Sequence, residues 1–157
     1  MAQALLAYED FPAGWSELAA NSYTVTREEI ISFASEFDPQ PMHMDEAAGS
    51  ASLLGGLAAS GWHICAIAMR LMSDAYISRS AGMGSPGLDE VKWLKPVRAG
   101  DTLRLRASCL EARVSKSRPE MGICVFLWEL LNQRDELVTM QRGYQMFRTR
   151  ASLGETS

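Results

Sequence analysis

Hydrophobic positions recur at helical intervals in the first half of the chain, and they alternate with polar positions in the second half. Between residues 30 and 37 the apolar side chains follow a period of about 3.6 residues. Thr26 followed by Glu29 has the spacing of an N-terminal capping box. We therefore predict a short strand over Tyr23–Thr26 and then a helix that ends at the turn beginning with Asp38.

Two further helices are predicted before the middle of the chain. Asp45 is a good N-cap for a helix of small residues that runs from Glu46 towards Ser52. From Gly61 to about Tyr76 the apolar side chains cover nearly the whole circumference of a helix. A helix with this pattern is typically buried, so we expect it to lie inside the domain.

After a glycine-rich loop at residues 82–87 the hydrophobic period changes from helical to alternating. Apolar and polar residues alternate within Thr102–Leu110, as in a strand with one buried face. Gly143, inside the last such segment, indicates a bulge or a close approach of another backbone. Four strands are predicted, at Val91–Leu94, Thr102–Leu110, Gly122–Leu131 and Leu137–Phe147.

Helices therefore precede strands, without the alternation of a parallel sheet. This order predicts an α+β protein with an antiparallel sheet. One long buried helix beside such a sheet implies that the sheet curls around the helix. No internal repeat and no linker divides the chain, so we expect residues 1–157 to form a single domain.

Composition narrows the class of function. The hydrophobic share of 47% and the charged share of 22% are those of an ordinary globular protein, and the net charge of -4 argues against nucleic acid as a partner. Cys65, Cys109 and Cys124 have no metal-ligand spacing, which favours reduced thiols, a cytoplasmic location and no metal site. The longest apolar stretch, Trp62–Met72, is interrupted by charge and too short to span a membrane.

Asp38 and His43 are the strongest candidates for chemistry, because the chain has only two histidines and this one lies near a carboxylate. Pro39 and Pro41 fix φ at two positions between them and bias the preceding residues away from helix. A carboxylate and an imidazole that converge on one point can hold a water and exchange protons with it. The alternative is structural: Asp38 caps a turn and His43 caps the following helix.

The segment Asp38-Pro39-Gln40-Pro41-Met42-His43 resembles the hydratase motif of the MaoC-like dehydratase family, which reads Asp, any residue, Asn, Pro, an aliphatic residue, His. Ser60–His63 resembles the start of the family's central helix, and Val91–Leu103 its following strand, turn and strand. Gln40 departs from the motif, although its amide can still orient a neighbour. The resemblance covers about residues 23–148 and implies a hot-dog fold, a curved antiparallel sheet wrapped around one long central helix.

The resemblance also implies an activity of the (R)-specific enoyl-CoA hydratase type, the reversible hydration of a 2-enoyl-CoA to a 3-hydroxyacyl-CoA. Asp38 and His43 would activate the water, and either of them is a candidate base. The Gly61 backbone N–H would stabilise the thioester enolate, since it lies at the positive end of a helix. Without the resemblance, Gly61 is equally well an ordinary helix-start glycine. Coenzyme A belongs to the substrate, so no further cofactor is expected, and a homodimer or higher homo-oligomer is implied.

Two rival functions share this fold. An acyl-CoA thioesterase also activates water with a carboxylate, but it attacks the carbonyl carbon. A non-catalytic acyl-CoA-binding module would keep the groove without the chemistry. The presence of both Asp38 and His43 favours hydration. Acyl chain length, the direction in the cell and the choice between coenzyme A and an acyl carrier protein stay open.

Other polar residues have simpler interpretations. His63, on the first turn of the central helix, is expected to be a satisfied core residue or to line the pocket, because the motif does not include it. Cationic side chains should border the entrance for the phosphates of coenzyme A, yet solvated surface charge is the better interpretation of each one. These candidates are Arg79, Lys92, Lys95, Arg98 and Lys116.

Overall fold

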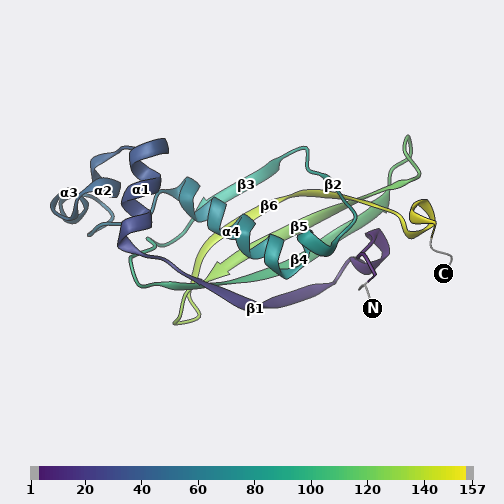
Figure 1. Ribbon diagram of the computed structural model, residues 1–157, viewed down its shortest axis with the longest axis horizontal. Helices are drawn as coiled ribbons and strands as arrows, with labels where there is room; N and C mark the ends of the chain where they lie inside the picture. The colour runs from purple at the N-terminus through teal and green to yellow at the C-terminus, as the bar shows by residue number, and fades with distance from the viewer. Residues whose placement is uncertain (1–3, 155–157) are drawn as a thin grey trace.

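The computed structural model describes residues 4–154, so the expected domain of residues 1–157 extends beyond it at both ends. The described chain contains four α-helices and six β-strands (Figure 1). They are β1 Ser16–Thr24, α1 Arg27–Phe37, α2 Pro41–Met44, α3 Glu46–Ala51, α4 Gly61–Ala75, β2 Gly82–Gly84, β3 Leu88–Trp93, β4 Thr102–Val114, β5 Met121–Leu131 and β6 Leu137–Arg148. Short 3-10 helices lie at Tyr8–Asp10, Ile77–Arg79 and Arg150–Leu153.

The strands form one antiparallel sheet in the order β1-β4-β5-β6-β2, and β3 also pairs with β6. The strand β1 is therefore one edge, and β2 and β3 together form the other. The long helix α4 lies along one face of the curved sheet, and α1, α2 and α3 gather at one end of it (Figure 1). This is the α+β architecture predicted from the order of elements, and it is the hot-dog fold that the family resemblance implies. No helix in residues 4–154 is long and apolar enough to cross a membrane.

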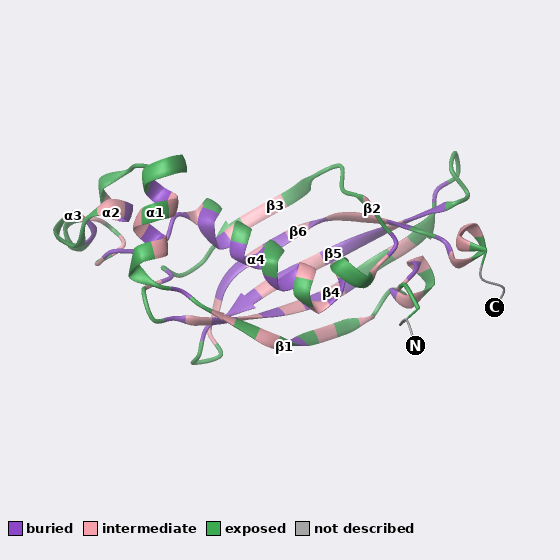
Figure 2. Ribbon diagram, in the orientation of Figure 1, coloured by how far each residue is buried: buried purple, intermediate pink, exposed green. Residues whose placement is uncertain are grey.

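The hydrophobic core lies between α4 and the sheet. Ile64, Ile67 and Leu71 of α4 are buried against sheet residues such as Leu105 and Phe126 (Figure 2). Burying this apolar stripe supplies the main driving force for docking the helix on the sheet.

The outer side of α4 differs from the prediction. Trp62 is 61% exposed and Met69 is 45% exposed, so the helix is buried on one side only within a single chain. The prediction of all-round burial is therefore wrong for a single chain. The sequence shows that a side chain is apolar, but it does not show which surface covers it.

Two strand assignments also change. The strand β1 begins at Ser16 rather than at Tyr23, and the glycine-rich segment contains the short strand β2. Neither strand has an alternating sequence. Both lie at sheet edges, where hydrogen bonds to the backbones of β4 and β6 define them.

The prediction for Gly143 is confirmed. The register between β3 and β6 shifts next to it, between Leu88 and Glu90. A Cβ at position 143 would lie 2.5 Å from Leu88 Cδ2 and 2.9 Å from the carbonyl oxygen of Gly87. Only a glycine admits this approach without displacing the β3 backbone.

Candidate active site

The turn between α1 and α2 places the carboxylate and the imidazole on one side of the chain. Asp38 is the C-cap of α1, where its backbone N–H donates to the Ala34 carbonyl at 2.9 Å. Gln40 is extended, as expected for a residue before proline, and Pro41 occupies the first turn of α2. His43 lies within that short helix, which contacts both α1 and α3.

Asp38 and His43 come together as the sequence predicted. The distance from Asp38 Oδ2 to His43 Nε2 is 3.5 Å, and the side chains are 16% and 8% exposed. The pair is thus withdrawn from bulk water but reachable. One water molecule can bridge two polar atoms at this separation.

The tautomer of a neutral His43 ring follows from the partner of its other nitrogen. Nδ1 lies 2.7 Å from the carbonyl oxygen of Ala58, which can only accept a hydrogen bond. Nδ1 therefore carries a proton and donates it, and in the neutral ring Nε2 presents its lone pair towards Asp38. Two acceptor atoms then face the same point.

Three groups determine the state of the Asp38 carboxylate. The Ser60 hydroxyl donates to Oδ2 at 2.6 Å, and the Gln40 amide donates to Oδ1 at 2.7 Å. These two hydrogen bonds, with a smaller contribution from His43, hold the pKa of Asp38 below its usual value against the opposing effect of burial. The carboxylate is therefore ionised at neutral pH.

Gly61 is the first residue of α4, with Ser60 as the N-cap. Among the described residues the Gly61 N–H has no hydrogen-bond acceptor. The structure also gives a packing reason for the glycine: a Cβ there would lie 2.4 Å from Trp93 Cε2. The indole of Trp93 covers this position and donates to the Gly61 carbonyl at 3.0 Å.

A cavity of about 470 Å³ joins these groups. Asp38, His43 and Gly61 all line it, and most of its other lining is apolar. The apolar lining consists of Met42, Leu53, Leu54, Ala58, Ala59, Trp62, Ile64, Trp93, Leu94 and Pro96. A pocket of this kind suits an apolar group that ends in a polar reacting centre.

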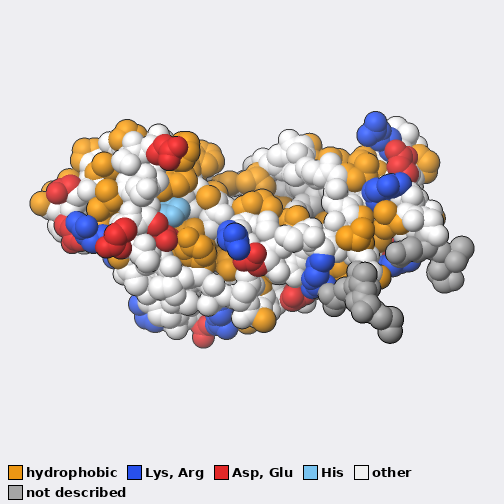
Figure 3. Space-filling model, viewed as in Figure 1, with side chains coloured by type: hydrophobic (Ala, Val, Ile, Leu, Met, Phe, Trp, Pro, Cys, Tyr) orange, Lys and Arg blue, Asp and Glu red, His pale blue; other side chains and the backbone are white. Residues whose placement is uncertain are grey.

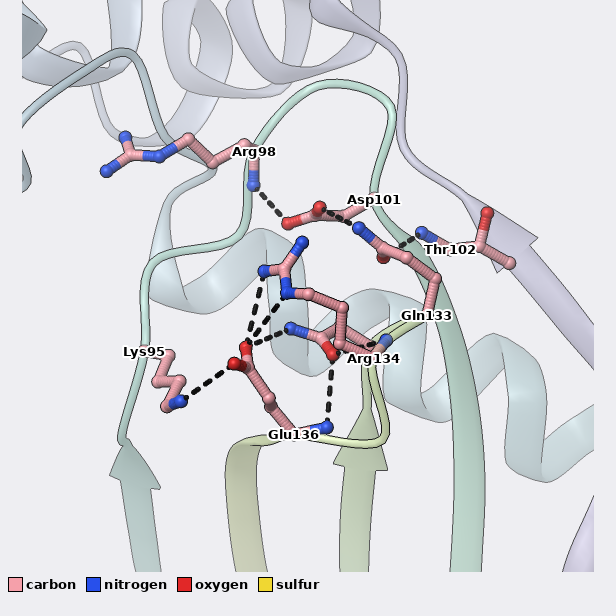
Figure 4. A network of polar contacts seen from close by, with 8 residues as sticks. Lys95, Arg98, Asp101, Thr102, Gln133, Arg134 and Glu136 are labelled. Carbon is pink, nitrogen blue, oxygen red and sulfur yellow. Dashed lines mark hydrogen bonds and ion pairs between the residues drawn. The ribbon is translucent and has the colours of Figure 1, made fainter.

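Five cationic side chains are candidates from the sequence. Of these, within residues 4–154, Lys95 alone lines the cavity. Its ammonium lies 3.3 Å from Glu136, which also accepts from Asn132 and Arg134 (Figure 4). These donors, Asn132 first, lower the pKa of Glu136 to about 2.

The other cationic candidates have partners elsewhere or lie in exposed turns. Lys92 pairs with Glu90 at 2.8 Å, and the Arg79 guanidinium donates to the Ala75 carbonyl. Arg98 points inward and donates to the carbonyls of Leu54 and Leu57, so it holds the loop that walls the cavity.

The second histidine lies apart from this site, between α1 and α4. His63 Nε2 is 3.6 Å from Glu29 Oε1, and the ring stacks on Phe33 at 4.8 Å between centroids. Burial lowers the pKa of His63, and the Glu29 carboxylate opposes that shift. His63 is thus a largely buried residue that does not line the cavity. Within residues 4–154 no group of three or more His, Cys, Asp or Glu side chains is arranged to hold a metal.

Sequence reasoning missed one residue of the site. The sequence predicts Ser60 only as the start of the central helix. A serine directly before a helix-opening glycine is a recognisable N-cap signal. Its contact with Asp38, 22 positions away, has no counterpart in the local pattern.

A hot-dog fold with an Asp/His pair and a helix N-terminus around one apolar cavity defines the class of the hydratase-like hot-dog proteins. The chain belongs to one family of that class, the MaoC-like domain family, whose model matches residues 12–123. This finding confirms the family predicted from the sequence.

The chain is also similar to several known proteins. The uncharacterized protein YdeM of Bacillus subtilis is 31% identical over 114 residues, which cover 73% of this chain and 79% of that protein. The crystal structure of the MaoC-like dehydratase from Rhodospirillum rubrum is 40% identical, with a TM-score of 0.87, and the match covers 92% of this chain and 98% of that one. The R-hydratase PhaJ1 from Pseudomonas aeruginosa shares the fold at 18% identity, with a TM-score of 0.71 over 92% of this chain and 87% of that one.

Proposed function

We propose that this protein is a hydro-lyase that adds water reversibly across the 2,3 double bond of an enoyl thioester of coenzyme A, giving the 3-hydroxyacyl-CoA. The observation that carries the proposal is the 3.5 Å separation of Asp38 Oδ2 and His43 Nε2 at the wall of a cavity that also reaches Gly61. Family membership and the shared fold with a protein named as an R-hydratase support it.

The two acceptor atoms of the pair position the water. A water that donates one proton to Asp38 Oδ2 and the other to His43 Nε2 turns its oxygen lone pairs towards the cavity. As that oxygen bonds to C3 of the enoyl group, one member of the pair takes a proton from the water. The pair then returns a proton to C2, so the net reaction consumes one water and no other reagent.

Negative charge develops on the thioester oxygen while C2 awaits its proton. The Gly61 N–H at the start of α4 is a donor without a partner in the described chain, at the positive end of a helix of 15 residues. A thioester carbonyl directed at this N–H would be stabilised as the enolate forms. The Trp93 indole donates to the Gly61 carbonyl, which belongs to the following peptide, and so helps to fix the residue that carries this N–H.

The apolar lining of the cavity suits the acyl chain, and coenzyme A enters as part of the substrate rather than as a separate cofactor. Lys95 at the cavity is the cation best placed to meet a phosphate of the substrate, although it must then leave Glu136. A homodimer fits the remaining exposed apolar surface. Trp62 and Met69 of α4 and Leu88 and Trp93 of the edge strand β3 are each at least 45% exposed.

The absorbance of the enoyl-thioester band tests this proposal. With crotonyl-CoA and then longer and branched enoyl-CoAs, we expect the native protein to remove the band without releasing free thiol. Asp38→Asn and His43→Ala should each slow the reaction by about a hundredfold or more, the usual contribution of general acid–base catalysis. Release of thiol would identify a thioesterase instead, and an unchanged band with every substrate would indicate a binding module.

A further inference from the structure

Ser60 joins two elements at the reacting carboxylate. It is the N-cap of α4 and is fully buried, whereas Asp38 ends α1. We infer that Ser60 is a positioning residue for Asp38, whose hydroxyl fixes the carboxylate oxygen that faces His43 and keeps the carboxylate ionised. This inference rests on the proposed function, which gives Asp38 its catalytic role.

The direction of the hydrogen bond is set by the helix. The backbone N–H of Trp62 donates to Ser60 Oγ at 3.3 Å, which is the ordinary N-cap bond. The hydroxyl proton is then left for Asp38 Oδ2, at 2.6 Å. A continuous chain of donors therefore runs from the positive end of α4 through Ser60 to the carboxylate.

Ser60 and Gln40 divide the two carboxylate oxygens between them. Gln40 donates to Oδ1 from the same turn as Asp38, and it is exposed. Ser60 donates to Oδ2, the atom that lies 3.5 Å from His43, and it comes from a different element that is packed into the core. Ser60 is therefore the group that ties the reacting oxygen to the rigid part of the molecule.

Removing this donor has two consequences for Asp38. The bond from Ser60 is the largest cause of the lowered pKa, so without it the pKa of Asp38 should rise towards the usual value. The carboxylate would also lose its fixed orientation towards His43. Both changes reduce the fraction of enzyme with an ionised, correctly turned Asp38, and the loss is greatest at acid pH.

The test compares variants that separate two functions of Ser60, the hydroxyl donor to Asp38 and the N-cap of α4. Ser60→Gly removes the hydroxyl but keeps an acceptable N-cap, and Ser60→Thr keeps both functions. We expect Ser60→Gly to lower kcat about 10- to 100-fold, the rate ratio of one hydrogen bond to a charged group. Its acid limb of the pH–rate profile should move to higher pH, whereas Ser60→Thr should restore the native profile.

A matched control addresses a purely structural role. Asp45 caps α3 by accepting from the Ala48 N–H at 2.9 Å and makes no bond to Asp38. Asp45→Gly likewise removes the capping side chain and should therefore leave the acid limb where it is. An acid limb that is the same in Ser60→Gly and in the native protein would overturn the inference.

A second readout does not depend on activity. In carbon NMR of the side-chain carboxyl groups, Asp38 should titrate at higher pH in Ser60→Gly than in the native protein. Should the glycine variant fail to fold, Ser60→Cys, a near-isosteric and weaker donor, should shift the titration in the same direction. An unshifted Asp38 overturns the inference, whereas a native protein that hydrates no enoyl-CoA overturns the proposed function alone.

Discussion

The site depends first on which atoms of single residues carry protons. His43 donates its Nδ1 proton to the Ala58 carbonyl, and Asp38 receives donors on both oxygens. When the ring is neutral, the Nε2 lone pair of His43 therefore faces the Asp38 carboxylate with no proton between them. This arrangement selects a small donor such as water, since any acceptor placed there would be repelled.

Asp38 makes stability depend on pH. Its pKa in the folded protein is lowered below the unfolded value, so its stabilising effect is complete above that unfolded value and is lost as pH falls through the folded one. We expect Asp38→Asn to have a lower urea midpoint than the native protein at neutral pH. At strongly acid pH the two midpoints should lie closer together. A gap that stays constant across this range would contradict the lowered pKa.

His63 should affect stability at a higher pH than Asp38 does. Burial lowers its pKa, so the stability that depends on the neutral ring is complete above the unfolded value of about 6.5 and is lost as pH falls below it. We expect the native melting temperature to fall between about pH 7.5 and about pH 5.5 by more than that of His63→Gln. Equal falls in the two proteins would show that His63 is not protonated on unfolding.

At the scale of elements, α4 and β3 meet closely at Gly61 and Trp93. Gly61→Ala would place a methyl group 2.4 Å from Trp93 Cε2. We expect this variant to lose about 1–3 kcal/mol of unfolding free energy in urea titrations, the usual cost of overpacking. In a double-mutant cycle, Trp93→Ala should relieve much of that loss because it removes the opposing ring.

The control for this prediction is Gly82→Ala. A Cβ at Gly82 has no atom within 4 Å, so the change should be nearly neutral. Additive effects of Gly61→Ala and Trp93→Ala would contradict the close contact.

The elements that the sequence predicted correctly are those with local signals. The capping box of Thr26 and the prolines around Gln40 act within a few residues, so α1 and the Asp38–His43 turn could be located. The starts of β1 and β2 could not, because backbone pairing with β4 and β6 defines them. The Ser60–Asp38 bond joins residues 22 positions apart and depends on how α4 docks.

The site lies at one end of the molecule. The helices α1, α2 and α3 gather there, and both ends of the described chain lie at the opposite end (Figure 1). Hydrophobic side chains are visible at the surface over α4 (Figure 3). Any fusion at either terminus should therefore leave the cavity accessible.

The exposed apolar surface of α4 and β3 predicts self-association. In sedimentation experiments we expect the native protein to have twice the mass of one chain or more. Met69→Glu, at a position that is 45% exposed on α4, should shift it towards a single chain, because a charge would have to be buried. Val114→Glu, at a similarly exposed position at the end of β4, should leave the mass unchanged. A native protein with the mass of one chain would contradict the homodimer.

The central claim is that Asp38 and His43 deliver water to C3 of an enoyl thioester. The most direct measurement is mass spectrometry after incubating the native protein with enoyl-CoA in water enriched in heavy oxygen. We predict that the heavy oxygen appears in an intact 3-hydroxyacyl-CoA, at a rate that falls sharply in Asp38→Asn and His43→Ala. Heavy oxygen in a free carboxylic acid, with coenzyme A released, would contradict hydration and assign the pair to thioester hydrolysis.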